Sequence, residues 1–443
     1  MDARELLKKL SDNSAVVCVV GLGYVGMHAA TGFAKSGLRV LGYDISEERV
    51  EALRKGIDWS GEIGKETIDK LVREKKISFH SNPSVIRDAD FVVVAVPTLL
   101  TSSKQPDLGP VRAASKTVGG NLKRGACVVL ESSVYPGVTE EVMLPILEQE
   151  SGMKAGRDFF VGYSPERVNP GDAEHTLEKI VKVVSGMDEG TADVVAALYS
   201  RVVKKGVFKA RSIKTAEAAK IIENIQRDIN IALLNEFALI FERMGISIWD
   251  VLEAAGTKWN FVKFRPGFVG GWCVPVNPYY LVHKAREAGY SPQVMLAGRS
   301  TNDHMPIHVA ELALRALNEA GKAAKKSSVL VMGLTFKENI REPRASPAKL
   351  MIETLRSHGL GVVGFDPNLA PEQIEKEFGI KSISGLGGSE KFDVVIVTVA
   401  HEQFKKITLA DIQKTMGANP VLVDVRAIYP ENEAGRMFKY IRL

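Results

Sequence analysis

One cysteine of this 443-residue chain has a type and a setting that suit covalent chemistry. Cys273 follows Gly270 and Gly271 in the stretch GGWCVP, and glycines beside a thiol let a substrate approach it closely. Cys18 and Cys127 instead fall within apolar runs, where a cysteine ordinarily fills a core. We therefore predict that Cys273 is a nucleophile.

A glycine pattern near the N-terminus predicts a dinucleotide site. Gly21, Gly23 and Gly26 form GLGYVG directly after an apolar run, and Asp44 ends the next run about twenty residues later. The glycines permit a tight turn and a close approach of pyrophosphate to the first turn of a helix. A carboxylate at Asp44 accepts the ribose hydroxyls and repels a 2′-phosphate, which favours NAD over NADP.

A thiol beside a nicotinamide can convert an alcohol to an acid, because it traps the aldehyde as a thiohemiacetal that is oxidised to a thioester and hydrolysed. That route needs an oxyanion partner and a base. Lys220, Asn224 and Asp228 recur every four residues and share one helix face. We interpret this face as buried and turned towards a cleft, with a solvated polar stripe as the alternative. Glu166 follows a predicted strand, where loops line the carboxyl end of a sheet.

The elements that must position these residues alternate between strands and helices, as in parallel α/β domains. Apolar β-branched runs predict strands at 15–20, 39–43, 91–96, 127–131 and 159–162, and four more within 327–334, 361–366, 392–400 and 421–425. Residues 212–245 predict one long helix, because they contain no proline and no glycine before Gly245. The predicted fold class is α/β, with two Rossmann-like doubly wound domains joined by a long central helix and a helical middle domain.

We place the domains at 1–205, 206–300 and 315–443, with a linker within Arg299–Lys326. The long helix carries an apolar stripe, so a homodimer or a higher homo-oligomer is expected through the middle domain. The charges nearly balance, with 58 basic and 53 acidic residues, so neither nucleic acid nor membrane is an expected partner. Three cysteines favour a reducing compartment, the cytoplasm, and no metal is predicted.

Taken together, segments of the chain resemble the UDP-glucose/UDP-N-acetylhexosamine 6-dehydrogenase family in the same order and over essentially the whole length. The matching stretches are GLGYVG, DFVVVAVPT, ESSVYPGVTEE, SPERVNPG, AKIIENIQRDINIALLNE, GGWCVPVNPYYL and GLTFKENIREPRASPA. The resemblance implies a four-electron oxidation of a sugar C6 hydroxymethyl to a carboxylate, with two NAD used in succession.

The resemblance also implies a role for each site residue. Cys273 would be the nucleophile, Lys220 would stabilise the oxyanion and Asn224 would orient the reacting oxygen. Glu166 would be the general base for thioester hydrolysis. Further residues expected at the cofactor are Tyr24, Val25, Pro97, Thr98 and Ser133. Residues expected at the substrate are Glu166, Arg167, Lys220, Asn224, Arg265, Gly270, Lys337, Arg344 and Arg426.

Three positions depart from the family pattern. Asn277 stands where the family usually has an acid four residues after the cysteine, and Ser133 stands for a threonine. Asn277 and Ser133 are still expected at the catalytic site, although the amide of Asn277 can position a water but cannot take its proton. Trp272 replaces a commonly seen histidine, and its bulk either narrows the pocket or packs against it.

The motifs PERVNPG and RPG resemble the branch that acts on UDP-N-acetylhexosamines of the manno or gluco type. UDP-glucose is the alternative sugar. Two other classes stay open: a two-electron dehydrogenase of the hydroxyacid type, which would not need Cys273, and an NAD-sensing scaffold without turnover.

Overall fold

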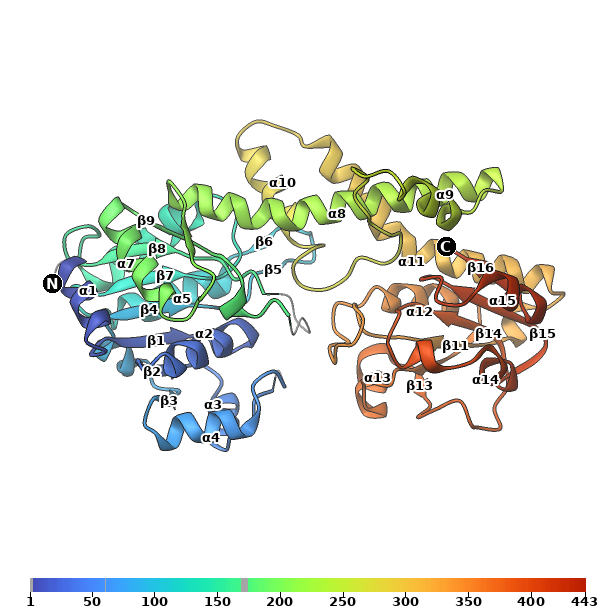
Figure 1. Ribbon diagram of the computed structural model, residues 1–443, viewed down its shortest axis with the longest axis horizontal. Helices are drawn as coiled ribbons and strands as arrows, with labels where there is room; N and C mark the ends of the chain where they lie inside the picture. Colours follow the sequence, from blue (N-terminus) through green and yellow to red (C-terminus); the bar gives the residue numbers. More distant parts are fainter. Residues whose placement is uncertain (1–2, 60, 169–173) are drawn as a thin grey trace. The chain divides into compact units, whose positions relative to one another are not determined.

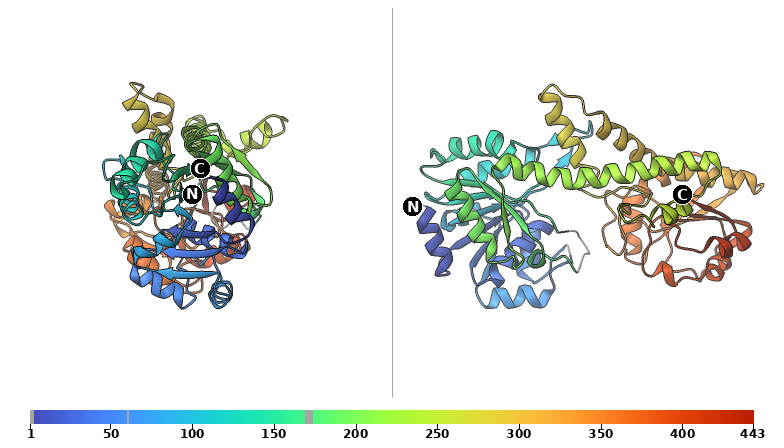
Figure 2. Two further views of the ribbon diagram at one scale, coloured as in Figure 1. Left: turned by 90° about the vertical axis from the view of Figure 1, so that its left-hand side faces the viewer. Right: turned by 45° about the horizontal axis from the view of Figure 1, so that its top comes forward.

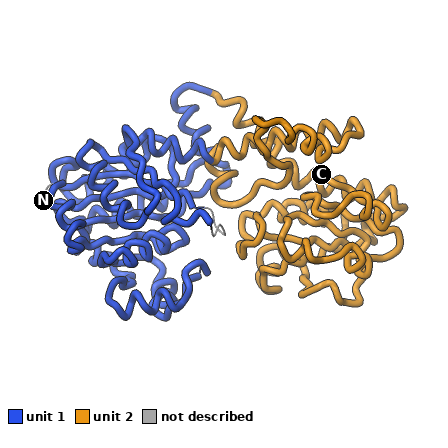
Figure 3. The backbone as a smooth tube through the Cα atoms, in the orientation of Figure 1, with its two compact units in different colours: residues 1–223, 279–290 blue, residues 224–278, 291–443 orange. Residues whose placement is uncertain are grey.

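The structure is a computed structural model that describes residues 3–59, 61–168 and 174–443. Two compact units divide it (Figure 3): unit 1 contains Met1–Glu223 and Tyr279–Tyr290, and unit 2 contains Asn224–Pro278 and Ser291–Leu443. The 32-residue helix α8 (Ile213–Met244) runs from unit 1 into unit 2, as the sequence predicts. The α/β class with two Rossmann-like sheets is confirmed.

Unit 1 is built on an eight-stranded sheet in the order β10-β9-β8-β7-β4-β1-β2-β3. Its neighbouring strands are parallel except β8 and β9. The strands are β1 (Val16–Val20), β2 (Arg39–Tyr43), β3 (Ile77–His80), β4 (Phe91–Val94), β7 (Cys127–Leu130), β8 (Phe160–Tyr163), β9 (Lys182–Gly186) and β10 (Val207–Lys209). A small antiparallel pair, β5 (Leu99–Leu100) and β6 (Pro106–Asp107), stands apart from the sheet.

The order β3-β2-β1-β4-β7-β8 is that of a doubly wound dinucleotide fold, whose ligand crevice opens at the carboxyl ends of β1 and β4. The helices of unit 1, shown in blue to green in Figure 1, are α1 (Ala3–Ser11), α2 (Tyr24–Lys35), α3 (Glu47–Arg54), α4 (Lys65–Arg73), α5 (Gly109–Gly119), α6 (Leu144–Ser151) and α7 (Glu189–Ser200). A π-helical turn at Thr139–Met143 precedes α6. Alternate strand residues such as Val17 and Val19 pack with α1, α2 and α7 in one core.

Unit 2 contains a six-stranded parallel sheet in the order β13-β12-β11-β14-β15-β16. The strands are β11 (Ser328–Met332), β12 (Gly361–Phe365), β13 (Lys381–Ser382), β14 (Phe392–Val397), β15 (Met416–Asp424) and β16 (Lys439–Arg442). The helices are α9 (Ile248–Ala255), α11 (Gln293–Glu319), α12 (Ala348–Ser357), α13 (Pro371–Phe378), α14 (Leu409–Lys414) and α15 (Glu431–Met437), and α10 (Asn277–Glu287) starts in this unit (Figures 1 and 2).

The second sheet is buried on both faces. Val329 and Val331 of β11 belong to one apolar core, whereas Leu330 and Met332 belong to another. This alternation explains why the strand reads as a continuous apolar run in the sequence.

The stretch in which the sequence predicts a linker is largely helical. Helix α11 covers most of Arg299–Lys326, and Pro306 lies inside it. Met305, Val309 and Leu312 of this helix are buried in the core of unit 2, so burial of an apolar face maintains the helix despite the proline.

Candidate functional site

The glycine-rich turn after β1 has the geometry that a pyrophosphate site requires. Gly21 has φ +93°, and a β-carbon there would lie 2.5 Å from the carbonyl oxygen of Ala95. A β-carbon at Gly26 would lie 1.8 Å from the carbonyl oxygen of Gly21. A β-carbon at Gly23 would meet nothing within 4 Å, which leaves open space beside the first turn of α2. The residues therefore fit a dinucleotide phosphate at this helix N-terminus.

Asp44 is held rigidly at the end of β2. The backbone N–H of Leu22 donates to its Oδ2 at 2.8 Å, and the N–H of Ser46 donates to its Oδ1 at 2.9 Å. Arg49 also donates to Oδ2, at 3.1 Å. The carboxylate is thus linked directly to the glycine-rich turn, and its remaining lone pairs can accept ribose hydroxyls.

The other predicted cofactor residues lie around the carboxyl ends of β4 and β7. Pro97 is exposed, and Thr98 and Ser133 are half-buried, as are Tyr24 and Val25 on α2. Ser132, which the sequence analysis does not single out, fastens this edge because its hydroxyl donates to the carbonyl oxygen of Val96 at 2.8 Å and accepts from the N–H of Val96 at 3.0 Å. A serine between the two loops is a common residue type with no distinctive spacing, so no sequence signal identifies it.

Cys273 is exposed, in contrast to the two buried cysteines. A β-carbon at Gly270 would lie 2.5 Å from Pro347 Cδ, and one at Gly271, where φ is +90°, would lie 2.8 Å from the Phe336 ring. The two glycines are therefore needed for the close packing of this loop against residues 336–347, all within unit 2. A tightly packed loop presents an accessible thiol.

The three polar residues predicted on one face of α8 have different surroundings. The amide of Asn224 donates to Asn277 Oδ1 at 2.5 Å, so these two residues are brought together within unit 2. Lys220, one turn earlier on the helix, is only 8% exposed, and we find no ion-pair partner for it among the described residues. Asp228 is fully buried, as the interpretation of this face expects, but it packs against α11, where it accepts from Arg299 at 2.5 Å.

Glu166 is buried in the loop after β8. Its Oε1 accepts from the backbone N–H groups of Arg167, at 2.6 Å, and Val168, at 2.5 Å. Its Oε2 is buried without a hydrogen-bond partner in the described part of the chain. The Arg167 guanidinium pairs with Glu223 of α8 at 2.8 Å. The rest of the SPERVNPG motif, residues 169–171, lies outside the described residues.

Two of the predicted substrate residues in unit 2 share a pocket. Arg265 and Arg426 line a cavity of about 300 Å³ together with Lys405, and Glu338 and Glu402 also border it. Arg426 forms an ion pair with Glu338 at 3.0 Å. Three cationic side chains around one cavity can hold a diphosphate. The prediction missed Lys405, since a lone lysine outside any motif carries no sequence signal.

The other basic residues predicted at the substrate do not line this cavity. Lys337 is half-buried in the loop after β11. The Arg344 guanidinium lies over the Trp272 ring, 5.9 Å from its centre, and pairs with Glu342 at 2.6 Å. The indole beside Cys273 therefore lies against an arginine side chain.

The turn after β11 repeats the arrangement found after β1. Gly333 has φ +94°, and the N–H of Leu334 donates to Asp366 Oδ2 at 2.7 Å. Here, however, the fully buried His401 also contacts the carboxylate, with its Nε2 3.1 Å from Asp366 Oδ2. The other ring nitrogen, Nδ1, accepts from the N–H of Asn339 at 2.9 Å. The side-chain partner of Asp366 is thus fully buried, whereas that of Asp44, Arg49, is partly exposed.

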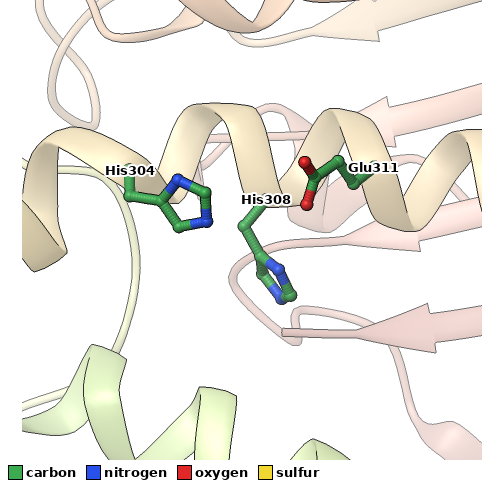
Figure 4. A group of neighbouring side chains, drawn as sticks. All are labelled: His304, His308 and Glu311. Atoms are coloured by element: carbon green, nitrogen blue, oxygen red, sulfur yellow. The ribbon is translucent and has the colours of Figure 1, made fainter.

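One group of side chains in the described chain could hold a metal ion. His304, His308 and Glu311 lie on successive turns of α11 (Figure 4), with potential ligand atoms within 4.8 Å of one another. His308 Nε2 already lies 2.9 Å from Glu242 Oε2, and burial lowers the pKa of this histidine. None of these residues belongs to the predicted site. No helix in the described ranges is both long and apolar enough to span a bilayer.

The chain matches three domains of the UDP-glucose/GDP-mannose dehydrogenase family along its length. Residues 15–203 match the NAD binding domain, residues 214–304 the central domain and residues 330–431 the UDP binding domain.

Curated relatives match over nearly full length. A UDP-N-acetyl-D-glucosamine 6-dehydrogenase of Salmonella typhi is 43% identical over 94% of this chain and 97% of its own. The protein of that name from Pseudomonas aeruginosa is 44% identical, with 94% and 98% covered. The solved structure of a UDP-D-ManNAc dehydrogenase from Pyrococcus horikoshii is 31% identical and superposes with a TM-score of 0.88, covering 96% of this chain and 98% of that one.

Proposed function

Because this chain belongs to the UDP-glucose/GDP-mannose dehydrogenase family and is an NAD-dependent UDP-sugar dehydrogenase, we propose that it oxidises the C6 hydroxymethyl of a UDP-N-acetylhexosamine to the carboxylate. The observation that carries the mechanism is the exposed Cys273 on a closely packed glycine loop, followed by the Asn277–Asn224 pair. An accessible, fixed thiol is what the acid-forming route requires.

The first half of the reaction produces an aldehyde. The turn at Gly21–Gly26 and Asp44 would hold NAD, which would accept the hydride from C6 when bound. Lys220 stabilises the oxygen of C6 as its proton passes to water, because a buried side chain that has no ion-pair partner among the described residues is available to a developing negative charge. Asn224 donates to the same oxygen or to the attacking water, and its link to Asn277 fixes its orientation.

The second half forms and cleaves a thioester. The Cys273 thiolate adds to the aldehyde carbon and gives a thiohemiacetal. Transfer of its hydride, which a second NAD⁺ would accept, and loss of the hydroxyl proton leave the acyl group on sulfur. A water then attacks the acyl carbon, Glu166 takes the proton from that water, and the carbon–sulfur bond breaks. The oxygen that takes the proton is Oε2, which has no hydrogen-bond partner in the described chain. The balance is one alcohol, two NAD⁺ and one water giving one carboxylate, two NADH and three protons.

The relatives support the N-acetylhexosamine branch. The two UDP-N-acetyl-D-glucosamine 6-dehydrogenases are 43% and 44% identical to this chain, whereas a UDP-N-acetyl-D-mannosamine dehydrogenase of Pyrococcus horikoshii is 32% identical. We therefore place UDP-N-acetyl-D-glucosamine before its manno epimer and before UDP-glucose. The diphosphate is held by Arg265 and Arg426 around the cavity of unit 2. Lys337 directly precedes Glu338 and Asn339, which also line this cavity, and Arg344 follows in the same loop.

The test is an NAD-reduction screen with UDP-N-acetyl-D-glucosamine, UDP-N-acetyl-D-mannosamine and UDP-glucose. We expect the gluco N-acetyl sugar to give the highest kcat/KM and two NADH per sugar. One NADH per sugar would instead support the two-electron alternative, and cofactor binding without turnover of any sugar would support a scaffold.

We further propose that the enzyme works in the cytoplasm as a homodimer. The exposed apolar side chains of α8, namely Ile222, Leu233, Phe237, Ile240 and Met244, support an interface with a second copy. Light scattering at micromolar concentration tests this, because a monomeric mass would contradict it.

A further inference from the structure

Three charged side chains lie buried together in unit 1, and the proposed chemistry uses only one of them. Glu131 follows β7, Lys182 begins β9 and Glu166 lies in the loop after β8. The side chains of Glu131 and Lys182 are fully buried, and that of Glu166 is 8% exposed. Charged residues are rarely buried to this extent without a specific partner.

Lys182 connects the two carboxylates. Its ammonium forms an ion pair with Glu131 Oε1 and lies 3.8 Å from Glu166 Oε2. The Tyr199 ring of α7 lies beneath the same ammonium, with its centre 4.9 Å from Nζ. The lysine is therefore held by one carboxylate and one aromatic face, with the second carboxylate within electrostatic reach.

The free oxygen of Glu166 faces this cation. Backbone N–H groups fix Oε1, while Oε2 has no hydrogen-bond partner in the described structure. Glu131 Oε2 is likewise buried and unpartnered. One ammonium thus lies beside two carboxylates, and the negative charge of Glu131 opposes the stabilisation that Lys182 gives to an ionised Glu166.

The other groups that face the cluster do not supply a second cation. Tyr163, at the end of β8, and Tyr199 stay neutral, because burial raises the pKa of each phenol well above its usual value. Arg167 is paired with Glu223 of α8. Burial also raises the pKa of Glu131, and Lys182 opposes that rise.

We propose that Lys182 is a positioning residue that keeps Glu166 ionised for thioester hydrolysis, and that Glu131 competes with Glu166 for this cation. The proposal rests on the proposed function of Glu166 as general base. It implies that Lys182 and Glu131 set, in opposite directions, the pH at which hydrolysis begins. A purely structural ion pair would not give shifts of opposite sign.

The test compares the pH dependence of kcat for acid formation in Lys182→Met and Glu131→Gln, with the UDP-sugar that turns over fastest. Removal of the cation destabilises the ionised form of Glu166. The acidic limb of the kcat–pH profile of Lys182→Met should therefore move to higher pH, by about one pH unit or more. Glu131→Gln keeps an oxygen acceptor for Lys182 but removes the competing charge. Its acidic limb should move to lower pH.

Lys123→Met is the matched control. Lys123 pairs at 2.7 Å with the buried Asp90, which precedes β4 at the amino end of the same sheet. This variant also removes a cation from a buried carboxylate, and its profile should stay that of the wild type. Thermal unfolding and NAD binding check that each variant folds. If Lys182→Met does not fold, the isosteric Glu131→Gln decides, and an unmoved acidic limb there overturns the proposal.

Glu166→Gln separates this inference from the proposed function. It should accumulate an acyl group on Cys273, detected by intact mass. Acid formation at the wild-type rate in Glu166→Gln would refute the proposal that Glu166 is the general base. Accumulation in Glu166→Gln with unmoved profiles in the other two variants would overturn only the role of Lys182 and Glu131.

Discussion

Asn277 accepts a hydrogen bond from the Asn224 side-chain amide at 2.5 Å, which ties the start of α10 to the middle of α8 within unit 2. Asn277 is 2% exposed, and its backbone N–H also donates to the carbonyl oxygen of Cys273 at 2.9 Å. The amide that replaces the usual acid of the family is therefore a connector between the nucleophile loop and Asn224.

This relationship predicts the effect of Asn277→Ala. Loss of the acceptor leaves the half-buried Asn224 amide without this partner, and an unpaired donor costs at most about 1–3 kcal/mol, the value for full burial. If that cost falls on the reacting geometry, kcat for acid formation should fall roughly tenfold or more, with NAD affinity unchanged. Asn277→Asp keeps the acceptor and should retain activity. Equal kcat in the alanine variant and the wild type would contradict the role of the pair.

Replacement of the nucleophile should separate chemistry from cofactor binding. Cys273→Ser should lower acid formation by roughly a thousandfold or more, because a neutral hydroxyl does not replace the thiolate. NAD affinity, measured by fluorescence titration, should stay near the wild-type value. Cys127→Ser is the control for loss of a thiol, since Cys127 is buried in β7. An active Cys273→Ser variant would refute the covalent route.

The contact between Trp272 and Arg344 predicts a substrate effect. In Trp272→Ala the guanidinium loses the aromatic face that lies 5.9 Å from it. A contact of this kind at an exposed site contributes about 0.5–1 kcal/mol, so KM for the UDP-sugar should rise a few-fold. Trp272→Phe keeps an aromatic face and should recover part of the loss. An unchanged KM in Trp272→Ala would show that Arg344 does not depend on the indole.

The glycine-rich turn offers a matched pair of substitutions. Gly26→Ala places a β-carbon 1.8 Å from a backbone oxygen that cannot move aside, so both thermal stability and NAD affinity should fall, stability by about 1–3 kcal/mol. Gly23→Ala meets no protein atom within 4 Å. It should leave the melting temperature unchanged and weaken NAD binding, because the new methyl group enters space that a pyrophosphate needs. Equal NAD affinity in Gly23→Ala and the wild type would contradict this placement.

The sequence predicts most of the fold because its signals are local. The strand at Arg39–Tyr43 and the long helix match the structure closely, since uninterrupted apolar patterns mark them. The strand β9 was not predicted: it begins with the buried Lys182, a residue type that argues against burial unless its partner is known. The helical character of residues 299–319 was also missed, because only the buried apolar face of α11 sustains a helix through Pro306.

The site residues also divide into those that a local sequence pattern predicts and those that depend on distant contacts. Gly21, Gly26 and Asp44 can be read from spacing, since each is required by backbone geometry or by its place after a strand. Ser132 and Lys182 contact groups far away in the sequence, and Lys405 lines a cavity with residues far away in the sequence; no motif marks any of the three. The position of Asp228 could not be predicted either, because a helical period shows which residues share a face but not what that face packs against.

The buried Glu217 of α8 predicts a pH-dependent stability. Its carboxylate accepts from the N–H groups of Gly137 and Thr139 at 2.6 and 2.9 Å, yet burial outweighs these bonds and raises the pKa of Glu217 from 4.5 to about 7. Between those two values the folded chain keeps a proton that the unfolded chain has released. The contribution of this group to the free energy of unfolding is therefore complete below about pH 4.5 and is lost as the pH rises through about 7.

The measurement is thermal unfolding of the wild type and Glu217→Gln from about pH 5 to about pH 8. Glutamine cannot ionise, so the variant should lack the part of the pH-dependent decline that Glu217 causes, on the order of 3 kcal/mol across the window. The variant also loses an acceptor for one N–H group, so its absolute stability should be lower at acidic pH. The slope against pH is consequently the readout: two curves that stay parallel over the whole range would show that Glu217 is ionised in the folded chain throughout, and that its three donors outweigh its burial.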